Sequence, residues 1–184
     1  VRAANTGQLQ AWRECIKRHG TRLLEHVDGR FSACVSTEDG QFWLIADRFA
    51  VSPICFRVLE GELHWNSRAD KLAAIYPSAE VEPQALFDYF YHHVIPAPRT
   101  LFRGVFRVPA GHVAVWNGTK TEIHRSWTPT FSGESLIDFE EAKARFLNCL
   151  ENSVREVLDP SSPACFLSGG TDSSTIAGMI GRVT

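Results

Sequence analysis

Residues 30–47 read RFSACVSTEDGQFWLIAD, and this stretch decides how the first part of the chain folds. Its two runs RFSACVS (30–36) and QFWLIAD (41–47) are rich in aromatic and β-branched residues, which favour strands. The segment TEDG between them has the composition of a turn. Two such runs around a short turn predict a β-hairpin, so we expect antiparallel strands here.

The same pattern occurs twice more along the chain. ICFRVLEGELHWN (54–66) has Glu60-Gly61 between two strand-like runs, and HVAVWNGTKTEIHRSW (112–127) has Asn117-Gly118, the strongest short hairpin signal in the sequence. Residues 94–112 are rich in Pro and Gly and predict an irregular segment. The first part of the chain is therefore expected to be an antiparallel, β-rich layer.

Helices are expected to pack on this layer. Apolar residues at helical spacing predict a helix over residues 7–27, interrupted near Gly20. Shorter helices are expected over residues 68–75 and 83–91, where Pro83 suits a first helical turn.

Composition limits the class of protein. The chain has 184 residues, is 44% hydrophobic and 22% charged, and carries a net charge of −2, which is typical of a globular protein. It has neither a basic run interleaved with aromatics nor an apolar stretch of about 20 residues, so we expect no nucleic-acid or membrane partner. The first residues form no signal peptide, and the missing initiator Met predicts a start inside a longer protein.

The five cysteines are odd in number, widely spaced and without a CxxC pair. We expect them to be buried free thiols of a cytoplasmic protein, because disulfides are rare in reducing compartments. They are Cys15, Cys34, Cys55, Cys149 and Cys165.

The character of the sequence changes after Trp127. TPTFSGES (128–135) is polar and rich in helix breakers, so we place a domain boundary there, between residues 1–130 and 131–184. Residues 138–159 predict an amphipathic helix capped by Asp138. ACFL (164–167) predicts a short buried strand, and a second helix is expected from Asp172 onward. Helix, strand, loop and helix in this order predict the start of an α/β domain with a parallel sheet.

The loop before the second helix has the composition of an anion site. Gly169 and Gly170 permit close approach to the backbone, and a helix N-terminus favours negative charge. The loop matches neither GxxxxGK[ST] nor GxGxxG, and no Lys or Arg occurs between Arg155 and Arg182. A bound triphosphate would therefore need Mg²⁺, with Asp172 as the local carboxylate. The alternative is a strand-to-helix turn that Asp172 merely caps.

Five ordered segments resemble the asparagine synthetase family. FLSGGTDSS (166–174) is similar to its pyrophosphate loop, SGG(L/V)DSS, and VDGRFSACV (27–35) to its L-x-G-x-F-A-F-A strand. IADRFAVSPICF (45–56) resembles R-D-R-x-G-x-x-P-L-Y-Y, and NSRADKLAAI (66–75) resembles S-E-x-K-A-L. IPAPRTLFRGVFRVPAGHVAVW (95–116) resembles P-x-T-x-F-x-G-I-x-x-L-P-P-G-H. Together these segments extend over most of the chain.

The resemblance implies a fold of class α+β in two parts. Residues 1–130 would be the C-terminal part of a glutamine amidotransferase-like domain, an incomplete antiparallel β-sandwich of the Ntn type with exposed strand edges. Residues 131–184 would be the N-terminal start of an asparagine synthetase-like, ATP-binding PP-loop domain with a parallel sheet. The chain would then be the central slice of a longer enzyme. The nucleophilic N-terminal Cys of the family would precede Val1, so no catalytic residue is expected within the chain.

The resemblance also implies a function for the parent protein. Members of the family release ammonia from glutamine, activate a carboxylate as an acyl-adenylate with ATP and Mg²⁺, and let an amine attack it. The expected partners are glutamine or another amine donor and a carboxylate substrate, and a homo-oligomer is left open. Asp172 is the expected metal ligand. The loop residues expected to bind ATP and its pyrophosphate are Leu167, Ser168, Gly169, Gly170, Thr171, Asp172, Ser173 and Ser174.

Several residues depart from the family pattern. Gln8 stands where an Asp normally holds the amine of glutamine, and Ala50 stands in place of the Gly of DRxG. Cys55 replaces a Tyr, and Arg68 replaces the Glu that follows Ser67. Relatives that lost glutamine hydrolysis, such as β-lactam synthetases and lasso-peptide cyclases, close intramolecular amides instead. An amide-forming cyclase is therefore the alternative enzyme, and a non-catalytic interaction module is a third hypothesis.

Two other pairs of residues suggest sites. His92 and His93 are adjacent and point apart at a helix end, so we expect no metal site there. Asp47-Arg48 is expected to have a structural role, because a buried Arg usually holds a backbone carbonyl or a carboxylate in place.

Overall fold

The computed structural model describes residues 6–75, 79–131, 133, 137–159 and 161–184. The chain divides into two compact units, Val1–Thr130 and Phe131–Thr184. Each unit is described by itself.

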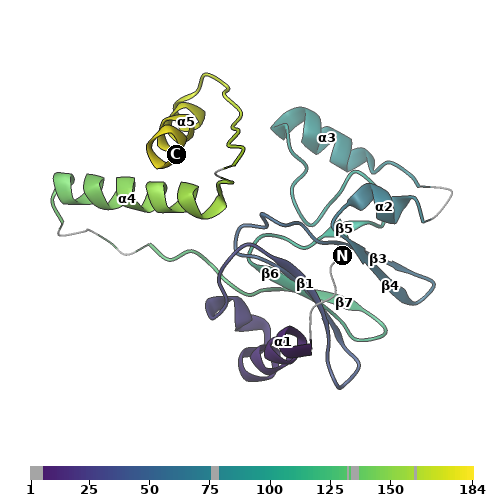
Figure 1. The fold of residues 1–184 in the computed structure, drawn as a ribbon. Coiled ribbons are helices and arrows are strands. Elements are labelled where there is room, and N and C mark those ends of the chain that lie inside the picture. Colours follow the sequence, from purple (N-terminus) through teal and green to yellow (C-terminus); the bar gives the residue numbers. More distant parts are fainter. Residues whose placement is uncertain (1–5, 76–78, 132, 134–136, 160) are drawn as a thin grey trace. The chain divides into compact units, whose positions relative to one another are not determined.

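The first unit contains two antiparallel sheets (Figure 1). One has four strands in the order β1 (Ser32–Ser36), β2 (Phe42–Ala46), β6 (His112–Trp116) and β7 (Thr121–Arg125). The other has the order β4 (Glu62–Asn66), β3 (Cys55–Leu59) and β5 (Phe106–Arg107). All three predicted hairpins are present, and the mixed fold with antiparallel sheets is confirmed.

The hairpin turns follow the local sequence with one difference. Glu60 and Gly61 both have positive φ, at 51° and 79°, which is the type I′ geometry that matches strand twist. In the third hairpin the paired strands end at Trp116 and Thr121, and the backbone N–H of Asn117 donates to the carbonyl of Lys120 at 3.2 Å. The Asn117 side chain accepts hydrogen bonds from the backbone N–H groups of Thr119 and Lys120, so the turn extends past the Asn-Gly pair.

One part of the core lies between the two sheets. Leu44 and Ala46 of β2 and Ala114 of β6 pack with Phe56 of β3 and with Val108. Side chains alternate across a strand, so the neighbouring residues of β2 point to the opposite face. That face is also buried, which explains why QFWLIAD is a continuous apolar run rather than an alternating one.

Helices cover the outer faces of both sheets. Leu23 and Leu24 pack against Ile45 of β2 and Val113 of β6. They belong to η1 (Gly20–Glu25), a 3₁₀ helix that follows α1 (Thr6–His19). The break at Gly20, where φ is +55°, agrees with the interruption predicted in this helix. The first unit is therefore layered as helix, sheet, sheet and helix.

The second sheet has its own helical cover. Leu72 of α2 (Ala69–Ala73) packs with Cys55 of β3 and with Val105. The next helix, α3 (Pro83–His92), begins at the proline as predicted. Its ion pair between Asp88 and Arg99, at 2.6 Å, ties the helix to the segment that leads into β5. The Pro- and Gly-rich segment was predicted to be irregular, but it contains β5, which pairs with β3.

The second unit contains α4 (Phe139–Val157) and α5 (Thr171–Val183). Asp138 caps α4 as predicted, because its carboxylate accepts a hydrogen bond of 2.9 Å from the backbone N–H of Glu141. Val154 and Met179 are the buried apolar residues of these helices. Among the described residues, no helix combines the length and apolar composition needed to cross a bilayer.

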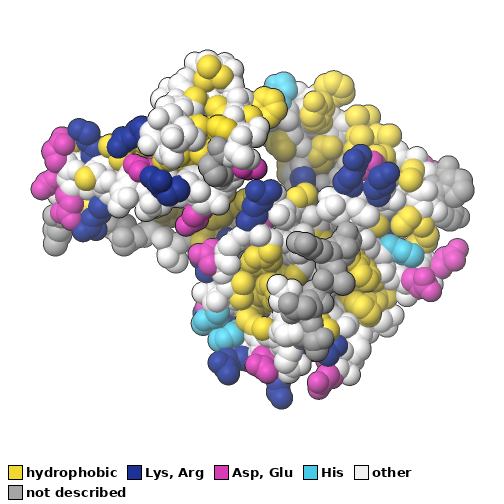
Figure 2. Space-filling model, viewed as in Figure 1, with side chains coloured by type: hydrophobic (Ala, Val, Ile, Leu, Met, Phe, Trp, Pro, Cys, Tyr) yellow, Lys and Arg dark blue, Asp and Glu magenta, His cyan; other side chains and the backbone are white. Residues whose placement is uncertain are grey.

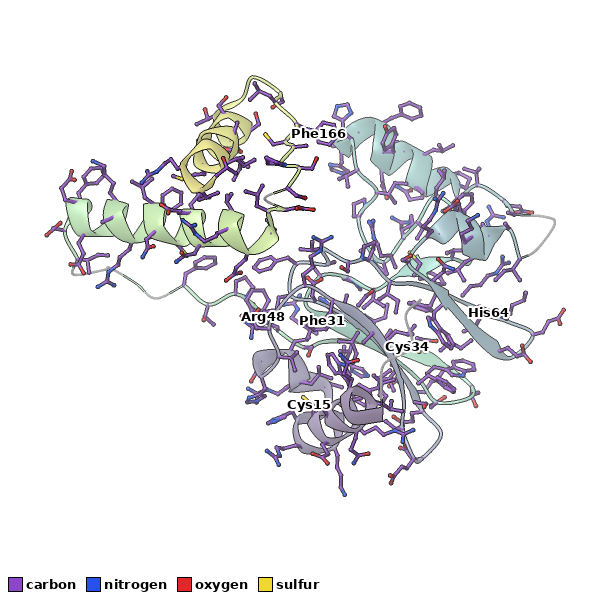
Figure 3. The ribbon with its side chains drawn as sticks, in the orientation of Figure 1. Cys15, Phe31, Cys34, Arg48, His64 and Phe166 are labelled. Atoms are coloured by element: carbon purple, nitrogen blue, oxygen red, sulfur yellow. The ribbon has the colours of Figure 1, made fainter. Side chains whose placement is uncertain are left out.

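Two predictions for this unit are wrong. ACFL is not a strand, because the described residues of the second unit offer no neighbouring strand to pair with it. Phe166 lies on this extended segment and is 99% exposed (Figure 3). The cysteines were all predicted to be buried, but Cys149 and Cys165 are exposed, Cys15 and Cys34 are half-buried, and only Cys55 is buried; all five thiols are free.

Candidate functional site

The glycine-rich loop before α5 is held in shape by its own hydroxyl groups. The Ser173 hydroxyl donates to the carbonyl of Gly170 at 3.1 Å and lies 3.0 Å from the Ser168 hydroxyl. The backbone N–H of Ser168 in turn donates to Ser173 at 3.2 Å. Gly169 adopts φ +82°, a conformation that residues with a β-carbon rarely adopt. The structure therefore brings the first and last parts of the predicted loop together.

The first turn of α5 leaves hydrogen-bond donors free for an anion. Its first backbone N–H groups, at Thr171, Asp172 and Ser173, have no acceptor within the helix. The helix dipole adds partial positive charge at the same end. Thr171, Asp172 and Ser174 are exposed, whereas the side chain of Leu167 contributes no polar group. Backbone N–H groups and hydroxyls in this arrangement are suited to phosphate oxygens.

Asp172 does not cap α5. The N-cap residue is Gly170, no side chain caps the helix, and Asp172 lies inside its first turn. Within the described part of the chain, the Asp172 carboxylate makes no hydrogen bond or ion pair. It is therefore free to bind a cation.

The side chains of the loop fit a magnesium–nucleotide complex better than a metal site made by protein alone. No group of three or more His, Cys, Asp and Glu side chains among the described residues could hold a metal ion. Mg²⁺ in nucleotide sites commonly takes one or two carboxylates and completes its shell with phosphate and water. One exposed carboxylate beside a turn with free backbone N–H groups agrees with that pattern.

The first unit has a second concentration of polar contacts, at the turn that follows β2. The Asp47 carboxylate is buried and accepts hydrogen bonds from the backbone N–H groups of Phe49 (3.0 Å), Val51 (3.1 Å), Ser52 (3.1 Å) and Phe31 (3.4 Å). Burial by itself raises the pKa of this carboxyl, but the four hydrogen bonds outweigh it and the net pKa lies below its ordinary value.

Arg48 holds the neighbouring segment. Its guanidinium donates to the carbonyl oxygens of Leu24 (2.9 Å) and Glu25 (3.4 Å) and lies over the ring of Trp127. Figure 3 labels the Arg48 side chain. This geometry supports the structural role predicted for Asp47-Arg48, although the two side chains bind different partners. The convergence of four N–H groups on Asp47 was not predicted; an Asp ahead of a turn is the signal that could have indicated it.

The residues that depart from the family pattern are spread over several elements. Gln8 lies on α1, and Cys55 is buried in β3. Burial raises the pKa of the Cys55 thiol. Arg68 precedes α2 and forms an ion pair of 2.6 Å with Asp70. Ala50 adopts φ +50°, the left-handed conformation in which glycine is favoured.

Comparison with known proteins gives one family and several relatives. Residues 11–127 match a family described as glutamine amidotransferase domain. Over 97% of its length the chain is 31% identical to the carboxyethyl-arginine beta-lactam-synthase of Streptomyces clavuligerus, of which it covers 33%. It is 27% identical over 87% of its length to a protein of Mycobacterium tuberculosis named as a glutamine-hydrolyzing asparagine synthetase, of which it covers 26%.

A third relative is a protein of Methanocaldococcus jannaschii that is also named as a glutamine-hydrolyzing asparagine synthetase. The chain is 23% identical to it over 90% of its own length and covers 33% of it. The chain thus spans about a quarter to a third of the length of these relatives.

Proposed function

This chain belongs to the glutamine amidotransferase domain family, and on that premise we propose that the whole protein is an ATP-dependent, AMP-forming amide synthetase. The relatives named above include asparagine synthetases and a beta-lactam synthase, which supports amide formation as the reaction class. The observation that carries the ATP-dependent part is the turn before α5, where free N–H groups and the exposed Asp172 carboxylate lie in one helical turn. Residues 131–184 would then be the start of the nucleotide-binding domain.

The proposed roles follow from the contacts of the loop. The backbone N–H groups of Thr171, Asp172 and Ser173 bind and orient phosphate oxygens. Ser168 and Ser173 hydrogen-bond to each other, and Ser173 also donates to the Gly170 carbonyl, so these contacts hold the loop in the shape that presents its N–H groups. Asp172 holds Mg²⁺, because no Lys or Arg lies between Arg155 and Arg182 to offset the phosphate charge. The magnesium–ATP complex supplies the activation of the carboxylate substrate.

The test is carboxylate-dependent exchange of labelled pyrophosphate into ATP, measured with the whole protein. Asp172→Ala should abolish exchange, because a carboxylate in a metal–phosphate site contributes several kcal/mol to transition-state stabilisation. Thr171→Leu is the matched control and should keep near-wild-type exchange, because the proposed contact of residue 171 is its backbone N–H. Wild-type exchange by Asp172→Ala would refute the metal role.

A second candidate is an intramolecular amide-forming cyclase that does not use glutamine. Two observations favour it: Gln8 replaces the Asp expected to hold the glutamine amine, and the beta-lactam synthase is a 31% identical relative. The amine donor decides between the two candidates. Ammonia release from glutamine, above a heat-inactivated control, would support the glutamine-dependent synthetase. If the protein exchanges pyrophosphate but releases no ammonia from glutamine, and Gln8→Asp does not restore ammonia release, the cyclase is supported.

A further inference from the structure

A groove of about 430 Å³ lies between α1 and the turn that joins β1 to β2. Its base includes Ile16 and Trp43, which are each 7% exposed and belong to the apolar core. Cys15 marks the position of α1 in Figure 3, and Figure 1 shows this helix beside β1. Ligand-binding pockets commonly have about 300–1,000 Å³, so the groove has room for a small molecule.

Charges of opposite sign come from the two walls of this groove. Arg13 and Lys17, four residues apart, lie on one face of α1. Glu38 and Asp39 lie on the turn. Glu14 of α1 also lines the groove and accepts a hydrogen bond from Gln10. The helix thus presents two cations and one carboxylate to this space, and the turn presents two carboxylates.

The polar groups of the walls are partly held in place and partly free. The Arg13 guanidinium is fixed by hydrogen bonds from Nε to the Ser36 carbonyl (2.8 Å) and from Nη2 to the Ser36 hydroxyl (3.3 Å), which leave Nη1 open. The Asp39 carboxylate accepts from Thr37 through Oδ1 and keeps Oδ2 open. Among the described residues, neither the Lys17 ammonium nor the Glu38 carboxylate has an ion-pair or hydrogen-bond partner.

We infer that this groove binds a zwitterion, namely an α-amino acid with an apolar side chain. Its carboxylate would be held by Lys17 and Arg13, its ammonium by Glu38 and Asp39, and its side chain would lie toward Trp43. An anion alone would pair with Lys17 and Arg13 only, and a cation alone with carboxylates only, whereas a zwitterion pairs with both kinds of group. This inference goes beyond the proposed function and does not depend on it.

L-Leucine and two analogues, titrated calorimetrically into the full chain, test the charge requirement. 4-Methylpentanoate is leucine without its ammonium, and 3-methylbutylamine is leucine without its carboxylate. L-Leucine should bind about tenfold or more tightly than either analogue, because each lacks one charge-assisted contact. No measurable binding of L-leucine, or equal affinity for L-leucine and 4-methylpentanoate, would overturn the inference.

Two variants locate the charges. Lys17→Ala should weaken L-leucine binding about tenfold and leave 3-methylbutylamine binding unchanged, because only the carboxylate contact is lost. Glu38→Gln should weaken L-leucine binding by a similar factor and leave 4-methylpentanoate binding no weaker. Lys71→Ala, at an exposed lysine of α2 outside the groove, is the matched control and should bind L-leucine as wild type does. Unchanged L-leucine affinity in both groove variants, with wild-type circular dichroism, would place binding elsewhere and overturn the inference.

Discussion

Replacement of Asp47 by Asn tests the organisation of the turn after β2. The Asp47 side chain is 1% exposed, and its two carboxylate oxygens accept from four backbone N–H groups. An Asn side chain of the same shape keeps the oxygen that faces Phe49 and Val51. Its NH₂ group replaces the oxygen that faces Ser52 and Phe31. The backbone N–H groups of these two residues then face a hydrogen-bond donor and lose their acceptor.

The expected loss follows from these two contacts. A buried donor left without a partner costs about 1–3 kcal/mol. The Ser52 bond is 3.1 Å and the Phe31 bond is the longer one at 3.4 Å, so the second contributes less. We therefore expect Asp47→Asn to lower the free energy of unfolding by about 2–4 kcal/mol, measured by urea denaturation followed by tryptophan fluorescence.

The pH dependence gives an independent measure. Because the pKa of Asp47 is lowered in the folded state, its contribution is fully present above the ordinary Asp pKa of about 3.9 and is lost as the pH falls toward the folded pKa. Asp47→Asn should remove this part of the acid dependence. Asp39→Asn, at an exposed turn, is the control and should change stability by less than about 0.5 kcal/mol. If Asp47→Asn lowers the free energy of unfolding by less than about 0.5 kcal/mol and keeps the acid dependence, the hydrogen bonds of Asp47 do not stabilise the fold as proposed.

Three further predictions concern other parts of the first unit. Ala50→Gly should raise the free energy of unfolding by about 0.5–1 kcal/mol in thermal melts, because the relief of left-handed strain at residue 50 exceeds the backbone entropy that glycine adds to the unfolded chain. The control Ala85→Gly, in the helix α3, should lower the free energy of unfolding. Burial and the nearby charges of His26 and Arg18 lower the pKa of His19, whose ring stacks on His26 at 3.7 Å. The free energy of unfolding, measured by urea titration, should therefore decrease as the pH is lowered from about 7.5 to about 5.5. The decrease should be smaller in His19→Asn. Arg48→Lys should lower the free energy of unfolding by about 1–2 kcal/mol in the same assay, because an ammonium cannot keep both carbonyl contacts and the ring contact. No measurable change would mean that the guanidinium contacts do not stabilise the fold.

The sequence by itself determined features whose causes lie within a few residues. The hairpins follow from strand-forming runs around short turns, and Glu60-Gly61 adopts the positive φ values that a two-residue turn requires. Asp138 caps α4 through an N–H three residues away. The chemistry of the loop before α5 was likewise predictable, because two glycines, several hydroxyls and one carboxylate are adjacent in the chain. Its role in nucleotide binding stays a prediction.

The tertiary structure alone decided which distant segments meet. β2 pairs with β6, about 70 residues later, and two residues of a Pro- and Gly-rich segment become β5 because β3 offers them an edge. A strand needs a neighbouring strand as its hydrogen-bonding partner. ACFL has strand-like composition, but the described residues of its unit contain no strand that could pair with it, so it does not form one. Asp47 shows the effect at one side chain: its neighbours in sequence supply three N–H groups, and the fold brings the fourth from Phe31. Local propensity depends on neighbouring residues, whereas a strand or a buried carboxylate needs partners that only the folded chain brings within reach.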